Sequence, residues 1–201
     1  MLHNQPGISM KKNKKGNTAA GGQPSYTEKL RLEKREKLFW QTNFTFPGDD
    51  PDNIPVEIDW VKFRYGNLDD EGVAFFVGRV KKVGMLDIYE APVTNAGIGL
   101  LAGMEYVREL RLKECRELDN DCMDDMVRIN GLELLYVMGS KINLDGLEKI
   151  GAITGLKELF ISSDLPDDEI SNRITRLKQV LPGCEFIVNH TPEYRYLEIK
   201  G

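Results

Sequence analysis

An apolar pattern that returns every 24 or 25 residues restricts the possible folds of this chain more than any other feature. The residues that open successive copies are Ile58, Val83, Val107, Leu132 and Leu156. Two more apolar residues follow each opening residue at the third and fifth positions. Because alternate side chains of a strand point to opposite faces, such a pair can fill a core while its neighbours face outward. A period of this length predicts an array of stacked repeats.

The segments between the predicted strands form a second recurring pattern. A polar turn follows each strand, and an apolar segment at helical spacing follows the turn, as in residues 93–101. Gly72, Gly97 and Gly146 fall at equivalent positions, and Cys122 takes that position in the third unit. We therefore predict an α/β leucine-rich repeat solenoid of about five strand-turn-helix repeats, with a curved parallel sheet and helices on its convex side.

Composition predicts one soluble domain with a basic leader. Apolar residues make up 41% of the 201 positions, yet no apolar run approaches the roughly 20 residues of a membrane-spanning helix. Residues 1–40 contain nine Lys or Arg and three Asp or Glu, whereas residues 41–201 contain 18 and 29. An acidic body matches a phosphate backbone poorly, which argues against nucleic acid as the main partner.

These patterns divide the chain into four segments. Residues 1–24 are predicted to be a disordered basic leader, since they have little apolar area to bury; their acid-poor composition also fits the remnant of a targeting peptide. Residues 25–55 are predicted to form a helical cap and connector, residues 56–190 the leucine-rich repeat domain, and residues 191–201 a C-terminal tail.

A repeat array needs both ends covered, because each unit buries its apolar faces only against its neighbours. Ser25, with Glu28 three positions later, is typical of a helix start. We expect this helix to reach about Trp40, and its side chains available for docking are Leu30, Leu38, Phe39 and Trp40.

At the C-terminal end, the acids of residues 167–169 begin a predicted helix that continues through Leu177 and Leu181. Pro182 and Gly183 stop it. Residues 184–188 then predict a final strand, and residues 194–197 are a candidate cover for the last repeat.

Candidate chemical groups in the sequence do not form a reactive set. The glycines of residues 97–103 have the spacing G-x-G-x-x-x-G, which is not the dinucleotide fingerprint. The cysteines and histidines are Cys115, Cys122, Cys184, His3 and His190. No four of them have zinc-site spacing, so we predict no metal and no cofactor. Cys115 is expected to bond the turn backbone after its strand, and all three thiols to be reduced.

Acidic residues gather before the predicted helices, at residues 69–71, 119–121 and 167–169. Carboxylates at such positions cap free amide groups and interact favourably with the helix dipole. We therefore interpret them as caps rather than as acid–base pairs. Neither histidine has a nucleophile beside it in sequence, and we predict that the protein is not an enzyme.

The outward face of the predicted sheet remains as a candidate binding surface. Stacked strands align its side chains in columns, and the candidate partner-binding residues are Trp60, Met85, Tyr89, Arg111, Leu134, Tyr136, Met138 and Phe160. The last four of these, Leu134, Tyr136, Met138 and Phe160, are expected to be exposed as one apolar patch, which on a soluble protein usually marks a partner site. The alternative is that the terminal segments cover part of this face.

Part of the repeat region resembles a known family. The matching positions are Val107, Leu110, Leu112, Cys115, Leu118, Asp119, Asp121 and Cys122. Residues 163–166 (Ser-Asp-Leu-Pro) and 181–185 (Leu-Pro-Gly-Cys-Glu) resemble the ending of the same family. Over residues 56–188 the chain resembles mitochondrial ATP synthase coupling factor B and its relative, the distal membrane-arm assembly component of respiratory complex I.

This resemblance implies a peripheral, non-enzymatic protein on the matrix side of the inner mitochondrial membrane. Its implied partners are subunits of a respiratory membrane complex, through which it would reach the membrane. Tyr89 stands where the family has a magnesium-contacting Thr, so no metal is carried over. The fourth repeat is shorter than in factor B, which favours the complex I branch over ATP synthase.

Two other classes of binding protein stay open. One is a cytoplasmic substrate adaptor of a ubiquitin ligase, whose cysteine-containing repeats look similar. Such an adaptor normally has an F-box-like helical trio, whereas residues 1–55 have room for one clear helix. The other is a bacterial repeat protein with an unknown partner.

Overall fold

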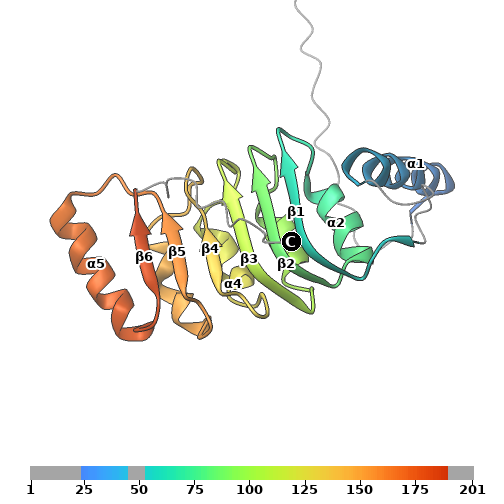
Figure 1. Cartoon of the computed structure of the whole chain (residues 1–201). Helices are drawn as coiled ribbons and strands as arrows, with labels where there is room; N and C mark the ends of the chain where they lie inside the picture. The colour runs from blue at the N-terminus through green and yellow to red at the C-terminus, as the bar shows by residue number, and fades with distance from the viewer. Residues whose placement is uncertain (1–23, 45–52, 190–201) are drawn as a thin grey trace, which may run out of the picture.

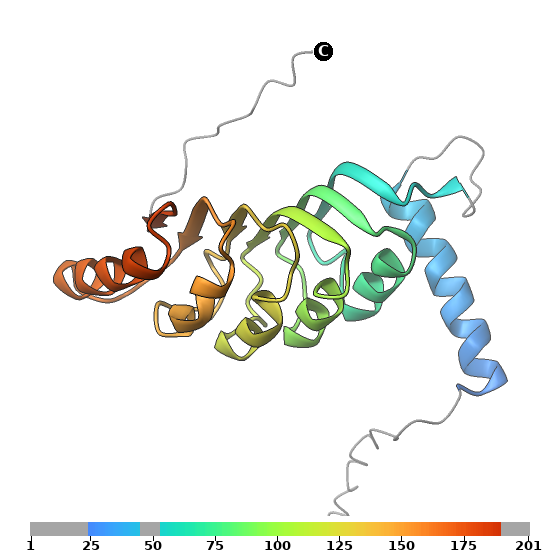
Figure 2. The same cartoon turned by 90° about the horizontal axis from the view of Figure 1, so that it is seen from below.

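One parallel sheet with helices along one face accounts for most of the chain (Figures 1 and 2). The computed structural model describes residues 24–44 and 53–189. Its strands are β1 (Glu57–Arg64), β2 (Lys82–Tyr89), β3 (Tyr106–Lys113), β4 (Leu134–Tyr136), β5 (Glu158–Ile161) and β6 (Glu185–Val188). They lie side by side in sequence order, and each pairs in parallel with the next. The fold is therefore α/β, with a solenoid-like order of strands.

Helical segments connect successive strands. They are α2 (Asp70–Arg79), α3 (Asn95–Leu101), η2 (Asn120–Cys122) with α4 (Met123–Met126), η3 (Gly146–Ala152) and α5 (Asp167–Val180). Figure 2 shows α2, α3, α4 and η3 in a row on one side of the sheet. The opposite side of the sheet, which we call the open face, carries no helix in the described part of the chain.

The predicted apolar pairs form the core between the sheet and the helices. Leu86, Leu110 and Leu135 pair in register across three neighbouring strands, and all three are 0% exposed. The strand register that we derived from the repeated pattern is therefore confirmed. The predicted final strand is confirmed as well, because β6 pairs with β5 from Glu185 to Val188.

The connecting segments are less uniform than the sequence pattern predicts. A turn of helix was expected in every unit, but η3 is a 3₁₀ helix and α4 contains only four residues. Gly146 and Gly151 lie within η3, and glycine lowers the stability of an α-helix by about 1 kcal/mol relative to alanine. Short segments of this kind often adopt the tighter 3₁₀ form.

Helix α1 (Tyr26–Asn43) covers the end of the sheet next to β1, as Figure 1 shows. The expected helix start is confirmed, since the Ser25 hydroxyl accepts a hydrogen bond from the amide of Glu28 at 3.2 Å. Phe39 and Trp40 are buried, and they contact a cluster of rings from β1 and α2. The helix continues three residues beyond the predicted end at Trp40.

Docking of Leu30 and Leu38 was predicted wrongly, because these side chains are 40% and 62% exposed. Ion pairs hold the early turns of α1 against the start of α2 instead. Arg31 forms an ion pair of 2.7 Å with Glu71 in the first turn of α2, and Arg35 pairs with Asp69. Only the last turns of α1 therefore contribute apolar contacts to the core.

The acidic residues before the helices mostly act as predicted. The Asp69 carboxylate accepts a hydrogen bond from the Gly72 amide at 2.9 Å, and Asp119 accepts one from the Asp121 amide at 3.0 Å. Capping is wrong for residues 167–169. Pro166 holds the cap position of α5, so these acids lie inside the first turn, where they favour the helix dipole without capping an amide.

We predict that Leu110→Ala lowers the free energy of unfolding by about 2 to 5 kcal/mol, because it opens a cavity between β2, β4 and the helices. Leu100, on α3, is 38% exposed and provides a matched control. Leu100→Ala should change the free energy of unfolding by no more than about 0.5 kcal/mol. Urea melts of the two variants provide the measurement, and equal losses would contradict the core assignment.

Candidate functional site

The open face presents aligned columns of outward-pointing side chains. One column contains Trp60, Met85, Glu109, Leu134, Glu158 and Glu185; the next contains Lys62, Asp87, Arg111, Tyr136, Phe160 and Ile187; and a third contains Arg64, Tyr89 and Lys113. In-register pairing produces these columns, because each side chain lies directly beside its partner on the neighbouring strand. Seven of the eight candidate residues belong to the columns. Met138 lies two residues beyond the end of β4.

A charged cluster occupies the open face over β1, β2 and β3. Its residues are Arg64, Asp87, Glu109, Arg111 and Lys113. Asp87 is only 2% exposed, and its Oδ2 lies 3.0 Å from Arg64 Nη2 and 3.6 Å from Lys113 Nζ. Arg111 donates a hydrogen bond of 2.7 Å to the Glu109 carboxylate. Burial lowers the pKa of Lys113, although the attraction of Asp87 acts in the opposite direction.

Two buried polar atoms of this cluster have no hydrogen-bond partner within the described residues. They are Asp87 Oδ1 and Arg111 Nε, which belong to register partners on β2 and β3. An unpaired buried polar group costs about 1 to 3 kcal/mol. Violations of this kind are expected where a sequence serves binding or chemistry in addition to stability.

Tyr136 and Phe160 form an aromatic pair beside the charged cluster. Their rings stack with centroids 5.2 Å apart and planes at 25°, and the Lys113 ammonium lies 5.3 Å from the centre of the Tyr136 ring. The two residues are 8% and 7% exposed. The expected exposure of these two rings is therefore wrong: each ring covers the other, and Lys113 also lies over Tyr136. Burial also raises the pKa of the Tyr136 hydroxyl.

The more exposed aromatic side chains lie at the opposite end of the open face. Trp60 on β1 is 51% exposed, with the Lys62 ammonium 5.6 Å from its ring centre. Tyr89 is half-buried beneath the Arg64 guanidinium, 5.5 Å away. Tyr65, which is 74% exposed, meets the Tyr89 ring edge to face at 5.6 Å. We call Trp60, Tyr65 and Tyr89 the aromatic edge.

Tyr65 was missed by the sequence reasoning. It has a positive φ of 53°, and Glu90 and Glu114 occupy the same place after β2 and β3 with φ of 49° and 53°. The repeat spacing was a usable signal, because these three residues fall at the same offset in consecutive units. Met85, Leu134 and Met138 complete the candidate set, and all three are half-buried.

The three cysteines are unsuited to nucleophilic or redox chemistry. Cys115, Cys122 and Cys184 are buried and free. Burial raises their pKa values to about 11, about 12 and about 11, respectively. The Cys115 thiol lies 3.8 Å from the Ile88 carbonyl, a sulfur contact between neighbouring units that agrees with the predicted backbone bond. At neutral pH these groups are thiols rather than thiolates, so they are poor nucleophiles.

Residues 24–44 and 53–189 contain no group of three His, Cys, Asp or Glu side chains arranged to hold a metal ion. His3 and His190 lie outside these ranges. Within the same ranges, no helix is long and apolar enough to cross a membrane. What the described residues offer on the open face is a surface of cations, carboxylates and aromatic rings.

We predict that Asp87→Asn lowers the free energy of unfolding by about 1 to 3 kcal/mol, because it removes the charge that holds Arg64 and Lys113. Glu57→Gln is the matched control. Glu57 also pairs with a lysine, Lys82, but it is 70% exposed, and loss of such a pair should cost less than about 1 kcal/mol. Parallel urea melts test this difference, and equal costs would refute a structural role for the charged cluster.

The buried thiols predict a loss of stability at alkaline pH. Their folded-state pKa values are raised above the ordinary 9.0, so the stability linked to their protonation is complete below pH 9. It is lost as the pH rises through the folded-state values of about 11 to about 12. The double variant Cys115→Ala, Cys122→Ala should therefore lose less stability than the parent as the pH rises from 9 to about 12. Urea melts at each pH provide the measurement. An equally steep loss in both chains would show that the thiols do not contribute.

Comparison with known proteins gives a partial match. No family model matches the chain. Over 110 residues it is 26% identical to a Homo sapiens protein named "ATP synthase subunit s, mitochondrial", covering 52% of this chain and 54% of the relative. The Bos taurus protein of the same name is 24% identical over the same shares. The chain thus spans about half the length of the curated relatives it matches.

Proposed function

We propose that this chain is a non-enzymatic leucine-rich repeat module that binds protein partners through the open face. In this proposal it is an accessory or assembly factor of a mitochondrial respiratory membrane complex. The observation that carries the proposal is the composition of the open face. It has a charged cluster in which two buried polar atoms lack a hydrogen-bond partner among the described residues, and aromatic rings lie on both sides of this cluster.

Each component of the open face has a recognised use in protein recognition. Tyrosine, tryptophan and arginine are the residues that most often dominate binding energy at interfaces. Trp60 and Tyr65 provide exposed rings at the aromatic edge, and Arg64 projects from the charged cluster with 35% of its side chain exposed. Rings and guanidinium groups that are already held in place lose less entropy on binding than free side chains do.

Assignment to leucine-rich repeats rests on the regular units. Strands follow one another in register at the predicted spacing, and side chains of equivalent loops bond one another from unit to unit. The Asn95 amide donates a hydrogen bond of 2.6 Å to Asp119, and the Asn120 amide donates one of 2.9 Å to Asn143. Such bonds between nearest neighbours are how a repeat array gains its stability.

The similarity to "ATP synthase subunit s, mitochondrial" supports an accessory role at ATP synthase in mitochondria. The alternative is the membrane arm of complex I. The fourth repeat, which is shorter than in factor B, favours this alternative. In either case we place the protein on the matrix side of the inner membrane. It would reach the membrane surface through its protein partner, in the absence of a spanning helix in the described residues.

Affinity capture from a detergent extract of mitochondria tests this proposal. Trp60→Ala with Tyr89→Ala removes two rings of the open face, and we expect it to reduce capture of the complex at least tenfold, since buried aromatic anchors contribute about 2 kcal/mol or more. The control is Tyr26→Ala with Leu100→Ala, which alters side chains that are 82% and 38% exposed on α1 and α3. This control should capture the complex as the parent does.

The identity of the captured subunits separates the alternatives. Capture of ATP synthase subunits by the parent chain would assign it to ATP synthase, and capture of complex I subunits would assign it to complex I. Thermal melts of both variants show whether each chain is still folded. If the variant with Trp60→Ala and Tyr89→Ala is folded and captures as much complex as the parent, the open face is not the interface. Failure of the parent to capture either complex would overturn the proposed function.

A further inference from the structure

Over β1, β2 and β3 the cations of the open face are more exposed than its acids. The cations are Lys62, Arg64, Arg111 and Lys113, and we call them the cation frame. The side chains of Arg64, Arg111 and Lys113 are 35%, 25% and 27% exposed, and Lys62 is exposed. Asp87 and Glu109 are only 2% and 17% exposed. Solvent at this part of the face therefore meets mainly positive charge.

Strand register gives the cation frame a roughly rectangular arrangement. Two of its members lie on β1 and two lie on β3, with β2 between them. The two cations of one strand are two residues apart, or about 6.6 Å, and β1 and β3 are two strand spacings apart, or about 9.6 Å. Alternate residues of an extended chain have the same spacing of about 6.6 Å. Carboxylates at such positions would match two cations of one strand.

The two arginines of the cation frame have further donors for a second carboxylate. Arg64 donates a hydrogen bond through Nη2 to Asp87 at 3.0 Å, and Arg111 donates one through Nη2 to Glu109 at 2.7 Å. A guanidinium has five N–H donors, so these bonds use only part of the set. Three members of the frame also lie 5.3 to 5.6 Å from the centres of aromatic rings. Side chains that are already held in this way lose less entropy on binding.

We infer that the partner of the open face presents an acidic segment to the cation frame, with carboxylates at alternate positions of an extended protein chain. This inference rests on the proposed function, since it names the chemistry of the partner. Such a segment complements the frame in both charge and spacing, and electrostatic complementarity of this kind governs which partner is accepted. The acidic stretch stops before β5 and β6, because Glu158 and Glu185 of the same face would repel it.

A phosphate backbone fits this surface less well than a protein segment does. Asp87 and Glu109 lie among the cations, and Glu90 and Glu114 directly follow β2 and β3. A single nucleic acid strand carries a charge about every 3.4 Å. So continuous a run of phosphates would meet the carboxylates as well as the cations. Carboxylates at alternate positions are spaced widely enough to reach the cations alone.

Short labelled peptides test the inference by fluorescence anisotropy with the full chain. One probe is an octapeptide of alternating glutamate and tyrosine, and the other has glutamine in place of glutamate. We expect the glutamate peptide to bind at least about tenfold more tightly, because only it carries the complementary charge. The double variant Lys62→Glu, Arg111→Gln should remove this preference. In this variant Arg64 and Lys113 still hold Asp87, and Glu109 keeps Arg108 as a partner at 3.6 Å.

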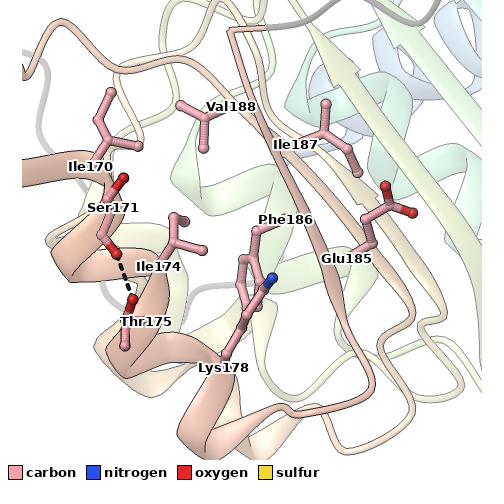
Figure 3. A pocket seen from close by; sticks show the side chains of 9 residues that line it. All are labelled: Ile170, Ser171, Ile174, Thr175, Lys178, Glu185, Phe186, Ile187 and Val188. Carbon is pink, nitrogen blue, oxygen red and sulfur yellow. Dashed lines mark hydrogen bonds between the residues drawn. The ribbon is translucent and has the colours of Figure 1, made fainter. Parts of the chain in front are cut away.

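The matched control is the double variant Lys178→Glu, Arg176→Gln, which changes the net charge by the same amount. Both residues are exposed on α5, at the end of the sheet opposite α1 (Figure 1). Lys178 lies beside the groove between α5 and β6 that Figure 3 shows, away from the cation frame. We expect this control to bind the glutamate peptide as the parent does. Urea melts show whether each variant is folded, and Lys62→Glu alone decides if the first double variant is not.

Other results would overturn the inference. Equal affinity of the parent and the folded Lys62→Glu, Arg111→Gln variant for the glutamate peptide would mean that the frame does not bind carboxylates. Equal affinity of the parent for the two peptides would mean the same. Tighter binding of a short single-stranded DNA, or of vesicles of anionic lipid, that this variant loses would assign the frame to phosphate groups.

Affinity capture from mitochondria separates this inference from the proposed function. If the parent captures a respiratory complex and the folded Lys62→Glu, Arg111→Gln variant captures as much, the acidic segment is wrong while the proposed function stands. If the parent captures neither complex, the proposed function fails, and the peptide affinities decide whether the cation frame binds an acidic segment.

Discussion

Each strand of the sheet pairs in register with its neighbour, and this pairing determines where almost every other side chain lies. A slip of one residue would turn Leu110 out of the core and bring Arg111 into it, because the strand alternates faces at every position. The spacing of 24 or 25 residues between units prevents the slip, since it brings equivalent residues of successive strands side by side. The core, the columns of the open face and the polar bonds between loops all follow from this spacing.

The same spacing explains how much of the structure could be predicted from the sequence. Local period and apolar pattern determine the strand register, so Leu86, Leu110 and Leu135 could be assigned to the core without coordinates. The candidate columns on the open face could be predicted in the same way. The exposure of their side chains could not be predicted, because it depends on neighbours on other strands and on long side chains that fold over them.

Tyr136 and Phe160 illustrate that limit. An outward position on a strand predicts exposure, but two rings at adjacent outward positions can stack and remove each other from solvent, and Lys113 removes more of the Tyr136 surface. Helix α1 shows the same limit at the level of an element. Its leucines looked able to dock, but the contacts of Arg31 and Arg35 with the acids of α2 settle its position.

Positive and negative charges are distributed unequally over the open face. The cations Lys62, Arg64, Arg111 and Lys113 lie on the first and third strands, whereas the column that begins at Trp60 ends in Glu158 and Glu185. A partner that bound this face, as proposed, would therefore meet opposite charges at the two ends of the face. Such a pattern contributes to orientation and to the rate of association more than to affinity.

Neighbouring parallel strands lie about 4.8 Å apart. The strands of the open face are therefore equally spaced, and its six strands span roughly 24 Å from the first to the last. An α-helix rises about 1.5 Å per residue, which means that a helix of roughly 16 residues would cross the whole face. Gain or loss of one complete unit would change this span by a single step and leave every column aligned. If the open face binds a partner as proposed, the number of units sets the length of the segment that fits along it, independently of the side chains that each unit displays.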